Sequence, residues 1–193
     1  MGEVTHIRPG IGGGLTPPIP LNASHDLNGF CCGKEPLDDW LRQRALNAEG
    51  RSARTYVVCQ GQAVVGYYAL ATGAEKRENV PKKMQRNMPE AVPLITLARL
   101  AVDVKNQGQR LGESLLRDAL LRCLEIAQVI GTRAVLVHAI DADALAFYLK
   151  YDFMQFPMGT QTLFLPIETI NQVFVAGASP PPKSDPGGKV PTA

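Results

Sequence analysis

The feature that most constrains this fold is an apolar stretch that passes through a short polar loop into a periodic helical segment. Residues 94–102 are largely apolar, as in a strand buried inside a sheet. The polar residues 103–109 follow, and apolar residues then recur at helical spacing from Leu111 to Ala127, before Gly131. A buried strand followed by a long amphipathic helix predicts an α/β unit whose helix covers one face of the sheet.

The rest of the chain extends this unit. Residues 36–45 predict a helix, because Pro36 suits a first helical turn and acidic residues follow it. Residues 53–59 and 63–72 predict a β-hairpin around a turn at 60–62. A further strand at 134–139, a helix at 142–151 and a last strand near 163–165 complete the pattern. We therefore expect a mixed α/β sheet flanked by helices.

Proline and glycine divide the 193-residue chain into three parts. We expect a flexible segment at 1–20, a single domain at 21–176 and a disordered Pro-rich tail at 177–193. The tail is explained equally well as an idle extension and as a partner-binding segment. No apolar run reaches ~18 residues, so we expect no membrane span.

The cysteines and the charges exclude two classes of protein. The four cysteines form no CxxC pair or His/Cys cluster, so we expect no metal site, and free thiols suit a reducing cytoplasm. A net charge of +2 excludes a strongly basic nucleic-acid-binding protein. Two local groups are nevertheless basic: Arg42, Arg44, Arg51 and Arg54, and then Lys76, Arg77, Lys82, Lys83 and Arg86. A solvated face explains any one of them, whereas their clustering favours phosphate binding.

The loop before the long helix is a candidate anion site. The first N–H groups of a helix lack intrahelical acceptors, and the helix dipole adds positive potential there. Gly108 and Gly112 would let a phosphate approach the backbone, which suggests a diphosphate-binding turn. The same glycines are explained about as well by a turn and by helix packing. The loop is neither GxGxxG nor a Walker loop.

Here the sequence resembles a known family. Leu100-Ala-Val-Asp103 followed by Gln107-Gly-Gln-Arg-Leu-Gly112 resembles the Gln/Arg-x-x-Gly-x-Gly/Ala signature of the GNAT superfamily of N-acetyltransferases. The resemblance narrows to the acetyltransferase toxins of bacterial type II toxin–antitoxin systems and covers roughly 21–170. The segments that carry it are Phe30-Cys-Cys-Gly33, Leu37-Asp-Asp-Trp-Leu41, Ala53-Arg-Thr-Tyr-Val57, Val65-Gly-Tyr-Tyr-Ala-Leu70, Val137-His-Ala139, Ala146-Phe-Tyr148 and Thr162-Leu-Phe-Leu-Pro166.

The resemblance implies a GNAT-like acyl-CoA N-acyltransferase fold and a cytoplasmic enzyme that acetylates the amino group of aminoacyl-tRNA with acetyl-CoA. It also implies a neutralising antitoxin, commonly a ribbon-helix-helix DNA-binding protein, and family members are often homodimers. By resemblance, Tyr148 supplies the proton for the departing thiolate. The implied cofactor-binding residues are Leu100, Ala101, Val102, Gln107, Gly108, Gln109, Arg110, Leu111 and Gly112.

Arg110 departs from the family, which usually has glycine at this signature position. An arginine there either crowds the pyrophosphate or binds a phosphate through its guanidinium. We expect a negative φ at this position, as is normal where a helix starts, so that arginine is sterically acceptable.

Acyl transfer to an amine needs a neutral amine, a donor for the oxyanion and a proton for the thiolate. Backbone N–H groups at the strand end can be the donor. A phenol of pKa about 10 can protonate a thiolate whose conjugate acid has a pKa near ~8.5. The sequence shows no obvious general base: we expect His138 to be a core histidine, and Asp141 and Asp143 to cap a helix. An aminoacyl α-amine, with a pKa nearer about 7.7, needs no strong base.

Two other functions remain open at this level. One is an ordinary GNAT acetyltransferase that acts on a small-molecule or protein amine. The other is a catalytically silent relative that binds an antitoxin or nucleic acid; Arg110 supports it and Tyr148 argues against it.

Overall fold

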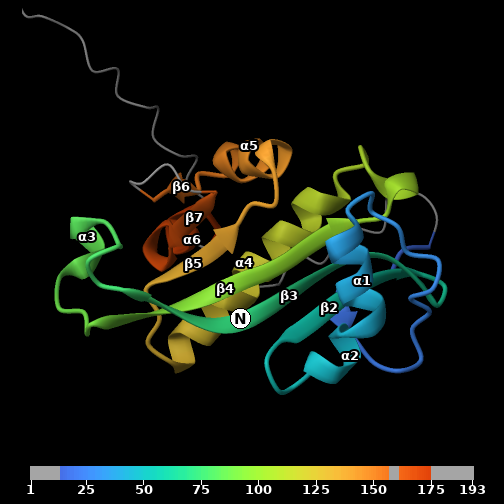
Figure 1. The fold of residues 1–193 in the computed structure, drawn as a ribbon, viewed down its shortest axis with the longest axis horizontal. Coiled ribbons are helices and arrows are strands. Elements are labelled where there is room, and N and C mark those ends of the chain that lie inside the picture. The colour runs from blue at the N-terminus through green and yellow to red at the C-terminus, as the bar shows by residue number, and fades with distance from the viewer. Residues whose placement is uncertain (1–13, 157–160, 175–193) are drawn as a thin grey trace, which may run out of the picture.

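A seven-stranded mixed sheet organises the molecule (Figure 1). The computed structural model describes residues 14–156 and 161–174. The sheet has the order β1-β2-β3-β4-β5-β7-β6, and all neighbouring strands are antiparallel except β4 and β5. The strands are β1 (Ile19–Pro20), β2 (Arg54–Gln60), β3 (Ala63–Lys76), β4 (Ala91–Val102), β5 (Ala134–His138), β6 (Met154–Gln155) and β7 (Thr162–Pro166).

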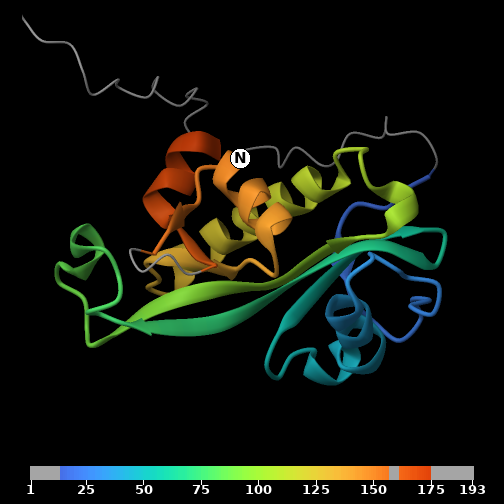
Figure 2. The same ribbon diagram turned by 45° about the horizontal axis from the view of Figure 1, so that its top comes forward.

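Helices cover both faces of the sheet, as the α/β pattern predicts. Figure 2 shows α1 and α2 on one face and α4, α5 and α6 on the other. The helices are α1 (Glu35–Gln43), α2 (Ala45–Ala48), α3 (Lys82–Gln85), α4 (Leu111–Val129), α5 (Ala142–Lys150) and α6 (Ile167–Phe174), with a short 3-10 turn at Val104–Asn106. The expected fold class is therefore confirmed. No helix among the described residues is long and apolar enough to cross a membrane.

The helix α4 packs closely on β3 because β3 has a glycine at the contact. A Cβ placed on Gly66 would lie 3.0 Å from Leu115 Cδ1 and 3.3 Å from Leu111 Cδ2. Both leucines are at most 2% exposed, and the stripe of α4 to which they belong is the periodic face seen in the sequence. Gly66 therefore sets how near the start of α4 lies to the sheet.

A polar network fixes the middle of α4 to the sheet. The Tyr68 hydroxyl donates to the Asp118 carboxylate, and Arg122 Nε donates to the same carboxylate at 2.9 Å and to the Tyr68 oxygen at 2.8 Å. Arg122 also lies 4.0 Å from the centre of the Tyr56 ring. Burial is the main cause that raises the pKa of Tyr68 above its ordinary value.

The N-terminal part of the sheet extends beyond the predicted elements. Residues 14–20 lie along β2, where Thr16 N donates to Cys59 O at 2.9 Å and Ile19 pairs with Val57. The strands β1 and β6 have two residues each, too few to show a period, whereas α6 does have apolar residues at helical spacing and was missed. We expected a flexible segment at 1–20, but residues 14–20 of it are held against β2 by these hydrogen bonds. Residues 1–13 and the predicted tail at 177–193 lie outside the described residues.

The strands β3 and β4 form a long ribbon whose tip carries α3, far from the end of β4 where α4 begins (Figures 1 and 2). A small apolar cluster supports the tip, in which Met84 and Val92 are buried against Phe156 and Phe164. The basic residues at 76–86 belong to this tip. At about 3.3 Å per strand residue, Ala91 lies roughly 30 Å from Leu100.

Candidate active site

The site begins where β4 separates from its parallel neighbour. Pairing between β4 and β5 ends at Leu97 and Val137, while β4 continues to Val102 beside β3. The register of β3 and β4 shifts just after this point, so that Ala98 is an extra residue in β4. The edge of β4 from 98 to 102 therefore faces a gap instead of a strand. Side chains already bond two carbonyls of this segment, Ala98 O and Val102 O, and no strand pairs with the residues between them on this side.

The segment from Asp103 to Arg110, the cofactor loop, joins this open edge to α4. The Asp103 carboxylate caps the 3-10 turn by accepting from Lys105 N at 3.0 Å. Gly108 has a φ of 75°, in the region that favours glycine, and a Cβ placed on it would meet no atom within 4 Å. The loop thus turns sharply and delivers the first N–H groups of α4 toward the gap.

Arg110 corrects an expectation drawn from the sequence. It is the N-cap residue of α4, and its φ is 61° rather than negative. An L-residue pays of order 1–2 kcal/mol in this left-handed region, which glycine occupies freely. The structure thus gives a backbone reason for glycine at this signature position, and the Arg110 side chain is exposed at the start of α4.

The side chains of Gln107 and Leu111 make contacts within the protein instead of lying free to bind a cofactor. The Gln107 amide donates to Val102 O at 2.9 Å and to Cys32 O at 3.1 Å. Leu111 is 2% exposed and packs in the core. A cofactor in the gap would therefore meet the backbone of these two residues more readily than their side chains.

A cavity of about 240 Å³ lies in the gap, and Tyr148 lines it. The ring of Tyr148 is held by Phe147 and Phe153, each with its centroid 5.3 Å away. The side chain is 5% exposed, and this burial raises the pKa of Tyr148 above its ordinary value. The cavity is lined by Cys32, Leu37, Leu100, Ala101, Val102, Gln107, Gly112, Asp143, Ala144, Phe147 and Tyr148.

The cavity brings six of the ten predicted site residues together. The others, Gly108, Gln109, Arg110 and Leu111, lie beside it in the loop and in the first helical position. Ala144 and Phe147 were missed, although their spacing from Tyr148 places all three on one helical face. Cys32 and Leu37 come from the N-terminal motifs, and no local signal placed those motifs beside the loop.

The other titratable residues near the gap have structural partners. His138 is exposed at the end of β5 and its Nδ1 lies 2.9 Å from Thr162 Oγ1, so the expectation of a core histidine is wrong. Asp141 does cap α5, because its Oδ1 accepts from Ala144 N at 2.8 Å. Asp143 lies in the first turn of that helix and lines the cavity.

A comparison with known families shows to which family this site belongs. A model of the acetyltransferase (GNAT) domain matches residues 51–155, more than half of the chain. The chain belongs to this family. The match includes the open edge of β4, the cofactor loop and Tyr148. Its activity class, acetyl transfer from acetyl-CoA, agrees with the geometry of a gap beside exposed backbone amides.

Known relatives of this GNAT protein include tRNA-modifying toxins. A tRNA-acetylating toxin of Mycobacterium tuberculosis is 47% identical over 141 residues, which are 72% of this chain and 85% of that protein. The solved structure of AtaT complexed with acetyl-methionyl-tRNAfMet is similar, with a TM-score of 0.76 and 29% identity, covering 83% of this chain and 99% of that chain. A tyrosine-to-phenylalanine mutant of the toxin AtaT, bound to the C-terminus of the antitoxin AtaR and acetyl-CoA, has a TM-score of 0.71 and 27% identity, covering 83% and 98%.

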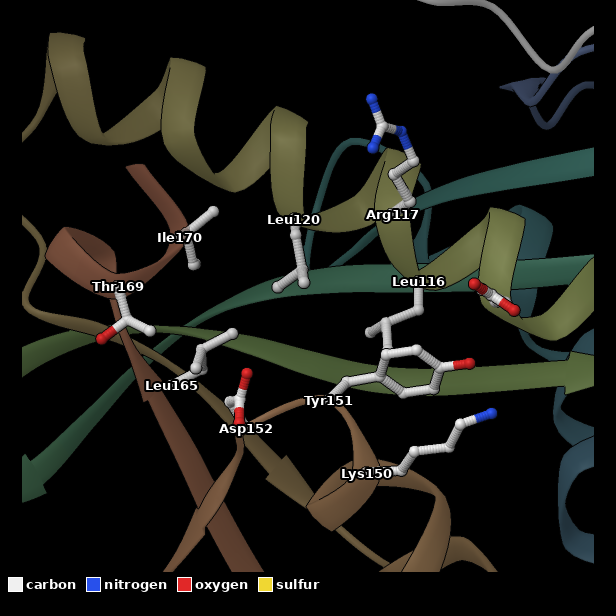
Figure 3. Close-up of a pocket in the computed structure, with 10 residues that line it drawn as sticks. Leu116, Arg117, Leu120, Lys150, Tyr151, Asp152, Leu165, Thr169 and Ile170 are labelled. Carbon is white, nitrogen blue, oxygen red and sulfur yellow. The ribbon is translucent and has the colours of Figure 1, made fainter. Parts of the chain in front are cut away.

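A second hollow of about 230 Å³ in this acetyltransferase lies between α4, α6 and the residues at the end of α5 (Figure 3). In Figure 3, Leu120, Leu165 and Ile170 face one another across its floor, and Lys150 and Tyr151 of α5 lie at its side. Tyr151 also touches Phe147, with ring centroids 5.1 Å apart. The last turns of α5 and Tyr151 therefore lie between the two hollows.

The basic residues divide between two places on this acetyltransferase. Arg42 donates to Phe30 O at 3.0 Å and Arg54 pairs with Glu49 at 3.1 Å, whereas Arg44 and Arg51 are exposed near them. At the ribbon tip, Lys76 and Arg77 pair with glutamates, and the exposed Lys82, Lys83 and Arg86 form no ion pair within 4 Å with any residue of 14–156 or 161–174. Within the described ranges there is also no group of His, Cys, Asp and Glu able to hold a metal.

Proposed function

We propose that this chain is the toxin of a toxin–antitoxin system, and that it acetylates the amino group of aminoacyl-tRNA to block translation. The observation that carries the proposal is the open edge of β4, which faces Tyr148 across a cavity beside the cofactor loop. The similarity to a tRNA-acetylating toxin over most of both chains supports the choice of substrate.

Acetyl-CoA supplies the acetyl group as a thioester. The residues of this chain that would hold it are the backbone of Leu100, Ala101 and Val102 along the pantetheine arm, and the amides at the start of α4 for the diphosphate. Gly112 fits this role, because a Cβ there would already touch Val102 and Phe147. Arg110 is exposed at the N-terminus of α4, and its guanidinium would add a charged contact to a phosphate bound there.

Tyr148 is the proposed catalytic residue. Its buried phenol keeps its proton at neutral pH, because burial raises its pKa, and it can donate that proton to the departing thiolate sulfur. A backbone N–H of the open β4 edge stabilises the oxyanion of the tetrahedral intermediate. The acceptor α-amine, with an ordinary pKa of about 7.7, is neutral often enough to attack without a strong protein base.

The tRNA is held mainly through its phosphates. Exposed Arg44 and Arg51 lie on the α1–α2 side, whereas Lys82, Lys83 and Arg86 lie at the ribbon tip, roughly 30 Å along β4 from the open edge that lines the cavity. A substrate that reaches from the cavity to the ribbon tip must be long, and one that binds the basic side chains there must be polyanionic, as a tRNA is. The separation argues against a small-molecule acceptor as the reason for the basic tip.

The partner of the toxin is an antitoxin of ribbon-helix-helix type, and the toxin itself forms a homodimer in the cytoplasm. The resemblance to the toxin family suggests each of these features. The solved complex of AtaT with the C-terminus of its antitoxin supports the antitoxin partner.

Growth of bacterial cells tests the proposal. The chain is induced alone, with its antitoxin, and as Tyr148→Phe. We expect arrest by the first only, with acetylated aminoacyl-tRNA in the arrested cells. Equal arrest by Tyr148→Phe, or arrest without acetylated tRNA, would contradict the proposal.

A further inference from the structure

Residues 30–34, which we call the bracket segment, include the motif Phe30-Cys-Cys-Gly33. The proposed acetyl transfer assigns no role to this motif. The segment is bonded to the cofactor loop at several points. Cys31 N donates to Asp103 Oδ2 at 2.9 Å, and Cys31 O accepts from Val104 N at 2.8 Å. Cys32 O accepts from the Gln107 side chain at 3.1 Å. These bonds join the N-terminal motif to a loop more than seventy residues later in the chain.

The bracket segment is equally well anchored to α1. Cys32 N donates to Asp38 Oδ1 at 2.8 Å, and the Asp38 side chain is buried. Lys34 O accepts from Leu37 N at 2.9 Å and from Asp38 N at 3.1 Å, which starts the helix. The backbone of Lys34 is therefore fixed by α1.

From this fixed position, Lys34 reaches the helix that carries Tyr148. Lys34 Nζ lies 2.7 Å from Asp141 Oδ2, while the other carboxylate oxygen of Asp141 caps α5. The ion pair raises the pKa of Lys34 and lowers that of Asp141. Tyr148 is the one fully buried residue of α5, and Ala144, Leu145 and Phe147 pack on the core while partly exposed, so the ion pair adds a polar contact at the start of the helix.

These contacts connect the two walls of the active-site cavity. Cys32 and Leu37 line one wall, and Asp143, Ala144 and Tyr148 line the other. A continuous path runs from the cofactor loop through Cys31 and Cys32 to Lys34, and then across the ion pair to α5. A shift of about 1 Å in a positioned catalytic group can cost up to 10²-fold in rate.

We propose that the bracket segment sets the distance between the cofactor loop and Tyr148, with Lys34 and Asp141 as positioning residues. The inference rests on the proposed function, because it assigns the proton donation to Tyr148. It assigns a role to the N-terminal motif, which would keep the acetyl-CoA thioester and the Tyr148 phenol at a fixed distance.

A double-mutant cycle in the full-length chain tests the inference, with acetyl-CoA and charged tRNA as substrates. Lys34→Met removes the charge at similar length, and Asp141→Asn keeps an oxygen that can cap α5. We expect each to lower kcat about fivefold, with both KM values within twofold of wild type. The double variant falls no further than the singles, and Lys34→Arg stays within twofold of wild type.

Amide hydrogen exchange of the same variants gives a readout without catalysis. We expect faster exchange in α5 of Lys34→Met, with exchange in the middle of α4 unchanged. Unchanged exchange in α5 of Lys34→Met overturns the inference, whether or not the wild type is active. Failure of the wild type to acetylate charged tRNA overturns the proposed function instead.

Three kinetic outcomes overturn the inference while the proposed function stands. The first is an unchanged kcat in both single variants of an active wild type. The second is a set of effects that add in the double variant. The third is a salt-dependent rise in the KM for charged tRNA in Lys34→Met, which would mean that Lys34 contacts the tRNA.

Discussion

The strand β4 begins beside α3 and ends beside the cofactor loop, and its two ends are built differently. At the loop end, backbone and side-chain hydrogen bonds from distant segments converge, and Asp38, Asp103 and Tyr148 are buried there. At the α3 end, a small apolar cluster supports exposed charges. The loop end holds its groups in place by hydrogen bonds and burial, as catalysis needs, whereas the tip presents exposed charge, which suffices for phosphates.

At the loop end, removing the hydroxyl of Tyr148 has the largest expected effect on the rate of acetyl transfer. Tyr148→Phe should lower kcat at least about 10²-fold, because it removes the proton donor for the thiolate. Binding of acetyl-CoA, followed by thermal stabilisation, should stay within twofold. The control Tyr151→Phe changes the neighbouring tyrosine outside the cavity and should remain active. Equal losses of kcat in Tyr148→Phe and Tyr151→Phe would contradict a specific role for the Tyr148 hydroxyl.

The next largest expected effect is on stability, from a larger residue in β3 where α4 packs against it. Gly66→Ala should lower the free energy of unfolding by about 1–3 kcal/mol, because the new methyl group meets leucines of α4 at 3.0–3.3 Å. The control Gly29→Ala places a methyl group where no atom lies within 4 Å. Denaturant unfolding of both proteins measures the difference, and equal stability would show that α4 can move away from the sheet.

The pH dependence of kcat/KM tests which groups titrate at the loop end. It should rise roughly tenfold from pH 6.5 to 8.5, as an acceptor amine with a pKa of about 7.7 loses its proton. No descending limb should appear below pH 9.5, because the raised pKa of Tyr148 keeps the donor protonated there. A descending limb near pH 8 would indicate a different acid.

Neutralising the ribbon tip should act on binding alone. The combined change of Lys82, Lys83 and Arg86 to glutamine should raise the KM for charged tRNA about tenfold and lower the salt slope by roughly 2, with kcat unchanged. Steady-state kinetics at several salt concentrations measures both. A lowered kcat at saturating tRNA would show that the tip acts on the chemistry.

Arg110→Gly has the smallest expected effect and separates two roles of one residue. Stability should rise by about 1 kcal/mol, because glycine adopts a φ of 61° without strain. The Kd for acetyl-CoA should rise a few-fold if the guanidinium contacts a phosphate. Thermal unfolding with and without acetyl-CoA shows both effects, and a drop in stability would contradict the strain argument.

The sequence predicts the centre of the fold well because strong periodicity and turn signals occur there. The stretch 94–131 and the hairpin at 53–72 have the predicted elements, with β3 and β4 longer than expected. The resemblance to the toxin family assigned Tyr148 to the site, and its catalytic role remains a prediction. The conformation of Arg110 could not be predicted, because residues around it, rather than its own preference, impose a positive φ.

Long-range contacts account for the rest of what the sequence left open. The bonds of Cys31 and Cys32 to the cofactor loop join residues that share no local pattern. The basic residues at 76–86 were recognisable as a cluster, but only the length of β4 shows that they lie far from Tyr148.

Transfer of radiolabelled acetyl from acetyl-CoA to purified charged tRNA tests the central claim most directly. The account predicts label on the aminoacyl group of charged tRNA, released with that group by mild base, and none on deacylated tRNA or in Tyr148→Phe. Label that enters a lysine-containing peptide or a small amine while charged tRNA stays unlabelled would contradict it.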